Sequence, residues 1–210
     1  SRVVSLGPPP TAGAGAPGSG DGWLDVLVQR LEIEQEGSLA TLARLDFVRR
    51  RDDLVITGKA GTGKSHILKA FALRACEQGV SLRYARCVDL LDDLHAGLAD
   101  GSYPRRLKAW SRPDLLIIDD VGLGQIRKRD DEPTAAHTLY NIIDRRHGRA
   151  STAVTSNISL SDWGRYLGDS TLTAAILDRL AMHAIRIDVD GPSYRQHVAK
   201  TRADTRAAKA

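Results

Sequence analysis

The sequence has little of what secreted and membrane proteins depend on. It holds only 2 cysteines in 210 residues, and the longest aliphatic run in the middle of the chain is residues 115–118. Two cysteines exclude a disulfide-rich scaffold, and a membrane-spanning helix would need about 20 consecutive apolar residues. The N-terminus has no apolar stretch that could act as a signal peptide. We therefore expect a soluble, cytoplasmic protein with no membrane partner.

The chain also lacks a strong charge excess. Its 30 basic and 26 acidic residues leave a net charge of +4, and 42% of its residues are apolar, enough for a sizeable core. From Arg195 onward there are 5 Lys or Arg against 1 Asp, so the preceding 194 residues hold 25 of each sign. The surplus belongs to the C-terminal end, and any nucleic-acid contact in the body of the chain would depend on local basic patches.

Composition predicts three segments. Residues 7–20 consist of Pro, Gly, Ala, Ser and Thr alone, which is typical of a flexible linker, and a helical pattern begins at Trp23. We therefore expect a linker at 1–21, a folded domain at 22–192 and a basic C-terminal helix or tail at 193–210.

Within the folded domain, strand-like and helical patterns alternate. The expected strands are 53–57, 81–86, 114–119, 151–156 and 184–189. The helical patterns lie at about 64–78, 87–98, 104–111, 134–148, 159–166 and 171–182. Such alternation, with mostly apolar strands, predicts an α/β fold in which a five-stranded parallel sheet lies between helices.

A phosphate-binding motif follows the first of these strands. Residues 58–65 read Gly-Lys-Ala-Gly-Thr-Gly-Lys-Ser, which matches the Walker A pattern G-x-x-x-x-G-K-[ST]. Its glycines let backbone N–H groups surround phosphate oxygens, and the helix that follows adds its positive N-terminal end. We expect Lys64 to reach the β- and γ-phosphates of ATP and Ser65 to bind Mg²⁺. The predicted ATP-binding residues are Gly58, Lys59, Ala60, Gly61, Thr62, Gly63, Lys64, Ser65 and His66, although His66 is expected mainly to pack beneath the loop.

Polar residues also follow two buried strands. Asp119 ends the strand at 114–119 and Asp120 follows it, and Asn157 follows the strand at 151–156. The carboxyl ends of parallel strands meet at one edge of a sheet, where ligands bind. We expect Asp119 to bind Mg²⁺ and Asp120 to orient or deprotonate the attacking water. Asn157 would touch the γ-phosphate or this water, although an Asn at a strand end is also a common turn former.

Together these residues resemble the AAA+ ATPases of the IstB and DnaC group, which are transposition helper ATPases and bacterial helicase loaders. The resemblance covers about residues 38–197. The matching stretches are 58–66, 112–122, 151–157, 163–180 and 191–195. It implies a P-loop NTPase fold, and the last stretch is most similar to the transposition helpers. The chain departs from the resemblance after the last expected strand, where too few residues follow for the full C-terminal lid of most AAA+ proteins, so we expect a minimal or absent lid.

The resemblance also implies roles that the residues alone do not. Asn157 would be the sensor of the γ-phosphate, and Arg179 the arginine finger donated in trans to the nucleotide of a neighbouring subunit. The chain would then be an ATPase, stimulated by DNA, that oligomerises on DNA and regulates a transposase. The alternative within the group is a DnaC-like loader of a replicative helicase. Asp120 stands where a Glu is common in AAA+ enzymes, which leaves its role as the base open.

Two other functions share the phosphate-binding motif. One is a small-molecule kinase. The stretches 112–122 and 151–157 fit an ATPase better than they fit such a kinase. The other is a nucleotide-gated scaffold that binds ATP and hardly hydrolyses it. This alternative stays open because the side chain of Asp120 is shorter than that of the usual Glu.

Three basic clusters are candidate DNA contacts, because clustered Lys and Arg meet phosphates. They comprise Arg105, Arg106 and Lys108; Arg127, Lys128 and Arg129; and Arg145, Arg146 and Arg149. We rank the first cluster highest, since initiator-type AAA+ proteins have a nucleic-acid-facing helical element there. None of the clusters has the spacing of a base-reading motif, so we expect largely sequence-independent binding.

Overall fold

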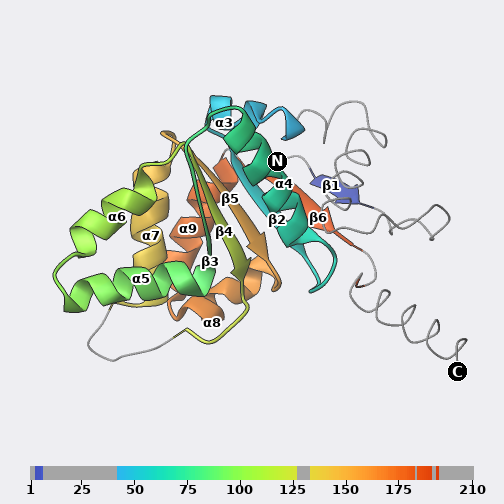
Figure 1. Ribbon diagram of the computed structural model, residues 1–210. Helices are drawn as coiled ribbons and strands as arrows, with labels where there is room; N and C mark the ends of the chain where they lie inside the picture. The colour runs from blue at the N-terminus through green and yellow to red at the C-terminus, as the bar shows by residue number, and fades with distance from the viewer. Residues whose placement is uncertain (1–2, 7–41, 127–132, 183, 191–192, 194–210) are drawn as a thin grey trace, which may run out of the picture.

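The computed structural model describes residues 3–6, 42–126, 133–182, 184–190 and 193 (Figure 1). The helices are α3 (Asp46–Arg50), α4 (Lys64–Glu77), α5 (Cys87–Ala99), α6 (Tyr103–Ser111), α7 (Ala135–Arg146), the 3₁₀ turn η1 (Leu160–Asp162), α8 (Trp163–Leu167) and α9 (Ser170–Met182). Outside the described residues lie the linker expected at 1–21 except for residues 3–6, the start of the helical pattern at Trp23, the basic cluster at 127–129, and the C-terminal segment from 194, where we expect a minimal or absent lid.

The sheet has six parallel strands in the order β1-β6-β2-β5-β4-β3. They are β1 (Val3–Leu6), β2 (Asp53–Gly58), β3 (Leu82–Arg86), β4 (Leu115–Val121), β5 (Ser151–Ser156) and β6 (Ala184–Val189). The five predicted strands and the α/β class are therefore confirmed. All six predicted helical patterns also correspond to helices, the one at 159–166 being divided between η1 and α8.

The sequence did not predict β1, which lies inside the range 1–21 that we expected to be linker. This strand pairs with β6 in parallel, with Val3 opposite Arg186. Four residues give too short a pattern to indicate a strand, and β1 is defined by its pairing with a segment about 180 residues later in the chain.

Helices cover the sheet on both faces (Figure 1). On one face, α3 and α4 pack over a core that includes Leu54 and Ile56 of β2. On the other, α5 to α9 pack over a core that includes Val55 of the same strand. This alternation within a fully buried strand is typical of a parallel sheet between two helical layers. No helix in the described part of the chain has the length and apolarity needed to cross a membrane.

The carboxyl ends of β2, β5 and β4 lie next to one another because these strands are neighbours. Thr57 is opposite Ser156, and Val121 is also opposite Ser156 from the other side. Between its pairs Ile118–Val154 and Val121–Ser156, β4 has one residue more than β5. Such bulges re-aim side chains beside active sites. Here the irregularity falls at Asp119 and Asp120, the two residues predicted to serve the nucleotide.

Candidate nucleotide site

The loop between β2 and α4 has the backbone conformation that a phosphate cradle needs. Gly58 has φ +147°, and a Cβ atom there would lie 2.2 Å from the carbonyl oxygen of Val189. Gly63 has φ +101° and caps the N-terminus of α4. Both positions require glycine, the first for the close approach of β6 and the second for its left-handed backbone. The loop therefore delivers the N-terminus of a 14-residue helix to the sheet edge, where its dipole favours an anion.

Lys64 lies inside this loop. The residue is only 4% exposed, and its Nζ donates hydrogen bonds to the carbonyl oxygens of Gly58, at 2.7 Å, and Lys59, at 2.8 Å. The hydroxyl of Thr62 also donates to the Lys59 carbonyl, at 2.9 Å. The ammonium group is thus held at the loop by residues of the motif itself, in the position from which it would neutralise phosphate charge.

Asp119 joins the loop to the rest of the sheet edge. Its carboxylate is 2% exposed, and Oδ1 accepts hydrogen bonds from Ser65 Oγ, at 3.0 Å, and from Thr155 Oγ1. Oδ2 accepts a hydrogen bond from the hydroxyl of Tyr84 at 2.5 Å. The structure therefore brings together Ser65 and Asp119, the two predicted ligands of Mg²⁺.

The chemistry of these two residues fits Mg²⁺. The ion prefers oxygen ligands, keeps several waters and is usually held by one or two carboxylates together with substrate phosphates. Ser65 and Asp119 would supply a hydroxyl and a carboxylate oxygen beside the phosphate loop. No cluster of three or more His, Cys, Asp or Glu side chains in the described ranges could hold a metal ion, so these two oxygens would act together with ATP.

Asp120 and Asn157, predicted to act on the attacking water, are in contact. Asn157 Nδ2 donates a hydrogen bond to Asp120 Oδ1 at 2.9 Å, and the backbone N–H of Asp120 donates to Thr155 Oγ1 at 2.8 Å. Asp120 has φ +61°, a conformation that non-glycine residues seldom adopt and that occurs often at functional sites. The bulge in β4 thus turns this carboxylate toward β5.

A pocket of about 340 Å³ adjoins Asn157. It is lined by Thr57, Gly58, Lys59, Asn157, Ile158, Ser159, Leu160 and Arg186. The pocket therefore lies between the start of the phosphate loop and the predicted sensor Asn157.

Sequence reasoning missed two residues of this site. Thr155 lies within the stretch 151–157 with no predicted role, yet its hydroxyl donates to Asp119 and accepts from the backbone of Asp120. Tyr84 has no motif around it, and its contact with Asp119 arises because β3 pairs with β4. His66 is exposed on α4, so the expectation that it packs beneath the loop is wrong; the helix turns its side chain outward.

Arg179 lies away from this site. Its Nε donates to Asp144 Oδ1 at 3.0 Å, its Nη2 donates to the hydroxyl of Tyr140 at 2.8 Å, and its guanidinium lies 4.7 Å from the centre of the Tyr140 ring. Both partners belong to α7. Because α9 ends directly before β6 begins, Arg179 lies near the amino ends of the strands, at the edge of the sheet opposite the phosphate loop.

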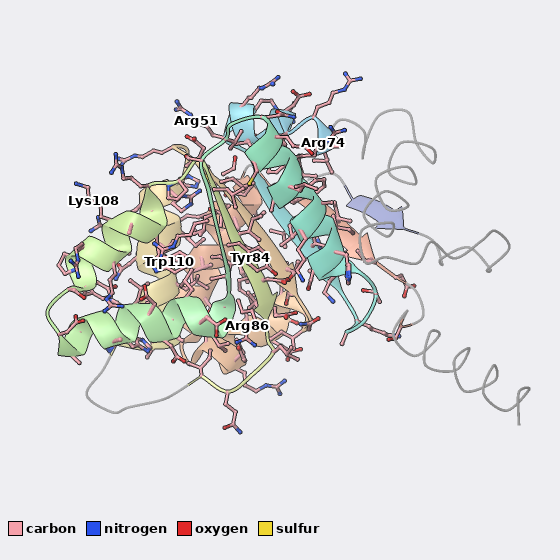
Figure 2. All side chains as sticks on the ribbon, viewed as in Figure 1. Arg51, Arg74, Tyr84, Arg86, Lys108 and Trp110 are labelled. Carbon is pink, nitrogen blue, oxygen red and sulfur yellow. The ribbon has the colours of Figure 1, made fainter. Side chains whose placement is uncertain are left out.

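The highest-ranked basic cluster is on α6, but its three members differ. Arg105 and Lys108 are exposed, and Lys108 projects outward (Figure 2). Arg106 instead forms ion pairs with Asp93 and, at 2.8 Å, with Asp100, which join α6 to α5 and the turn between them. Of the three, Arg105 and Lys108 are therefore the cations that this helix exposes to solvent.

The third cluster contains one residue that the structure places in the interior. Arg146 is 1% exposed and donates hydrogen bonds to Thr152 Oγ1 and to the carbonyl oxygens of Ser111, Pro113 and Ser151. The proposal of Arg146 as a DNA contact is wrong, because the last turn of α7 points it beneath the sheet edge. Arg149 is exposed and lines a second pocket, of about 290 Å³, with Arg49 and Arg51.

Comparison of the chain with known proteins shows its family. Residues 28–203 match the family model of IstB-like ATP binding proteins. An insertion sequence IS5376 putative ATP-binding protein of Geobacillus stearothermophilus is 32% identical over 76% of this chain and 62% of its own length. The putative insertion sequence ATP-binding protein y4pL of Sinorhizobium fredii is 37% identical over 72% of this chain and 60% of its own length. The chain thus spans about three fifths of these relatives.

Solved structures confirm the fold. The DnaC helicase loader superposes with a TM-score of 0.55 and 19% identity over 74% of this chain and 92% of its own. The replication initiator DnaA bound to AMPPCP and single-stranded DNA gives a TM-score of 0.59 and 18% identity over 76% of this chain and 49% of its own. The sheet is that of a P-loop AAA+ domain, and the chain belongs to the family of IstB-like ATP binding proteins.

Proposed function

We propose that this chain is a cytoplasmic, Mg²⁺-dependent ATPase that assembles as a homo-oligomer on DNA and regulates the transposase of an insertion sequence. The observation that carries the proposal is the contact of Ser65 with Asp119 and of Asn157 with Asp120 at one sheet edge beside the phosphate loop. A glycine-rich turn that binds no nucleotide would not need these four polar groups around it.

Each residue would have a distinct part in hydrolysis. Lys64 would neutralise the β- and γ-phosphates, while Ser65 and Asp119 would hold Mg²⁺, which supplies further charge neutralisation when bound. Asp120 would accept the proton of the attacking water. Its Oδ1 is taken by Asn157, so Oδ2 is the oxygen available for that proton. Asn157 would fix this carboxylate and contact the γ-phosphate.

Arg179 would act on the nucleotide of a neighbouring subunit. Its place near the amino ends of the strands supports this role, since no side-chain rotation carries it across the sheet to its own phosphate loop. An arginine supplied in trans stabilises transition-state charge and couples hydrolysis to assembly. In the monomer Asp144 and Tyr140 hold the guanidinium half-buried, and a neighbour's phosphates would compete for it.

Relatives and surface charge support DNA and a transposase as partners. The relatives are named as ATP-binding proteins of insertion sequences, and Arg105 and Lys108 are exposed on α6. Contacts of this kind meet phosphates and carry little sequence information. The DnaC-like loader remains the second candidate because the DnaC domain shares this fold over nearly its whole length.

ATP turnover with and without DNA tests the proposal. Turnover and particle size would be measured in the same samples with duplex DNA, single-stranded DNA or neither. We expect DNA to raise turnover together with growth to oligomers, and Arg179→Ala to abolish the increase. A preference for duplex DNA supports the transposition role, and a preference for single strands supports the loader. A monomer whose turnover ignores DNA would contradict both and favour the kinase.

A further inference from the structure

Tyr84 holds the buried carboxylate of the predicted magnesium site from the side opposite Ser65. It lies on β3 opposite Ile117 of β4, and its side chain packs with the core beneath α4 (Figure 2). From there its hydroxyl reaches diagonally along the neighbouring strand to Asp119 Oδ2, at 2.5 Å. Tyr84 thus belongs to the sheet edge that forms the nucleotide site, although no Walker motif includes it.

The two oxygens of Asp119 are divided between different partners. Oδ1 accepts hydrogen bonds from Ser65 Oγ at 3.0 Å, from Thr155 Oγ1, and from the backbone N–H of Asp120 at 3.1 Å. Among the described residues, Oδ2 accepts a hydrogen bond only from Tyr84. Rotation of the carboxylate plane about the Cβ–Cγ bond would turn its oxygens away from Ser65. The Tyr84 hydroxyl opposes that rotation and keeps one carboxylate oxygen beside Ser65.

The chemistry of a phenol suits this task. A phenol hydroxyl donates one hydrogen bond, and bonds donated to carboxylates are among the stronger ones in proteins. Tyr84 directs this bond at Asp119 Oδ2. Because it contacts Asp119 and lies beyond it, Tyr84 acts through that side chain.

We propose that Tyr84 is a positioning residue of the magnesium site, whose hydroxyl fixes Asp119 Oδ2 so that Oδ1 and Ser65 Oγ together face the metal ion bound with ATP. The inference rests on the proposed binding of ATP and Mg²⁺ at the phosphate loop. Partners that orient a metal ligand in this way typically contribute 10- to 100-fold to metal affinity or activity.

Tyr84→Phe tests the proposal, because it removes only the hydroxyl. Tyr103→Phe is the matched control, since its hydroxyl accepts a hydrogen bond from Asn141 Nδ2 at 3.1 Å between α6 and α7, away from the phosphate loop. Binding of a fluorescent, non-hydrolysable ATP analogue would be titrated with Mg²⁺ and, separately, in EDTA. Mn²⁺ binding to the analogue complex, followed by electron paramagnetic resonance, reports the metal directly.

For Tyr84→Phe we expect the Mg²⁺ concentration at half-maximal effect to rise about tenfold, with binding in EDTA unchanged. Mn²⁺ affinity should fall in parallel, and Tyr103→Phe should match the wild type in both. An unchanged Mg²⁺ midpoint would overturn the proposal, as would an equal loss of analogue binding with Mg²⁺ and in EDTA, which would show damage to the loop itself. Failure of the wild type to bind the analogue would instead overturn the proposed function, and the inference with it.

Discussion

Asn157 donates a hydrogen bond from Nδ2 to Oδ1 of Asp120 across the ends of two neighbouring strands, at 2.9 Å. This contact depends on the bulge in β4, which places Asp120 at φ +61° and turns its carboxylate toward β5. A residue predicted to sense the γ-phosphate and one predicted to activate water are therefore coupled before any nucleotide contact. Movement of Asn157 toward a phosphate would directly alter its hydrogen bond to the Asp120 carboxylate.

Replacing Asp120 by Asn should remove the proposed base while keeping the side chain's size. General bases contribute about 10²–10⁴ to rate, so we expect turnover to fall at least about 100-fold with binding of a non-hydrolysable analogue retained. Lys64→Ala should instead weaken that binding itself. Turnover would be followed by phosphate release and binding by fluorescence titration. Unchanged turnover in Asp120→Asn would show that another group takes the proton.

Arg146 should matter for stability and not for DNA. Its guanidinium is buried and hydrogen-bonded to three backbone carbonyls and to Thr152 Oγ1. Because Arg146→Ala leaves these acceptors without a donor, we expect the free energy of unfolding to fall by about 3 kcal/mol or more. Its neighbour Arg145 is exposed, and Arg145→Ala should change stability by at most about 0.5 kcal/mol. Urea denaturation of both variants makes the comparison, and equal small losses would contradict the structural role.

The two cysteines should differ sharply in reactivity. Cys76 is exposed, whereas Cys87 is buried, and burial raises the pKa of the Cys87 thiol to about 12. The thiolate is the reactive form, so at pH 8 a thiol reagent should label one cysteine in the native protein and both in denaturant. Cys76→Ser should leave no fast-reacting thiol. Rapid labelling of Cys87 in native protein would show that the core around α5 opens readily.

Most of the fold was predictable because its signals are local. The Walker A loop, the aliphatic run of β4 and the 3.6-residue periodicity of the helices each occupy one continuous stretch, and the structure follows them closely. Even the burial of Arg146 had a local sign, since it follows Leu139, Ile142 and Ile143 at helical spacing on the apolar face of α7. Charge alone, on which the predicted DNA contact of Arg146 rests, does not contain this information.

What could not be predicted depends on pairing between distant segments. The strand β1 exists through its register with β6, and Tyr84 reaches Asp119 because β3 lies beside β4. The two acceptor positions of Asp119 are filled from three different elements. No spacing within the chain encodes such contacts, which follow only from the order of the strands.

The claim that Arg179 acts between subunits is tested most directly by mixing two inactive variants. Lys64→Ala keeps the arginine and lacks a working phosphate loop, whereas Arg179→Ala has the loop and lacks the arginine. Asp144→Ala is the control for structure, since it removes an ion-pair partner of Arg179, at 2.9 Å, and leaves the guanidinium in place. Turnover of each variant, alone and mixed in equal amounts on DNA, is the measurement. We predict that each of the first two is inactive alone, that their mixture recovers activity, and that Asp144→Ala stays active alone. A mixture as inactive as its components, or an Arg179→Ala variant as active as the wild type, would contradict an arginine finger donated in trans.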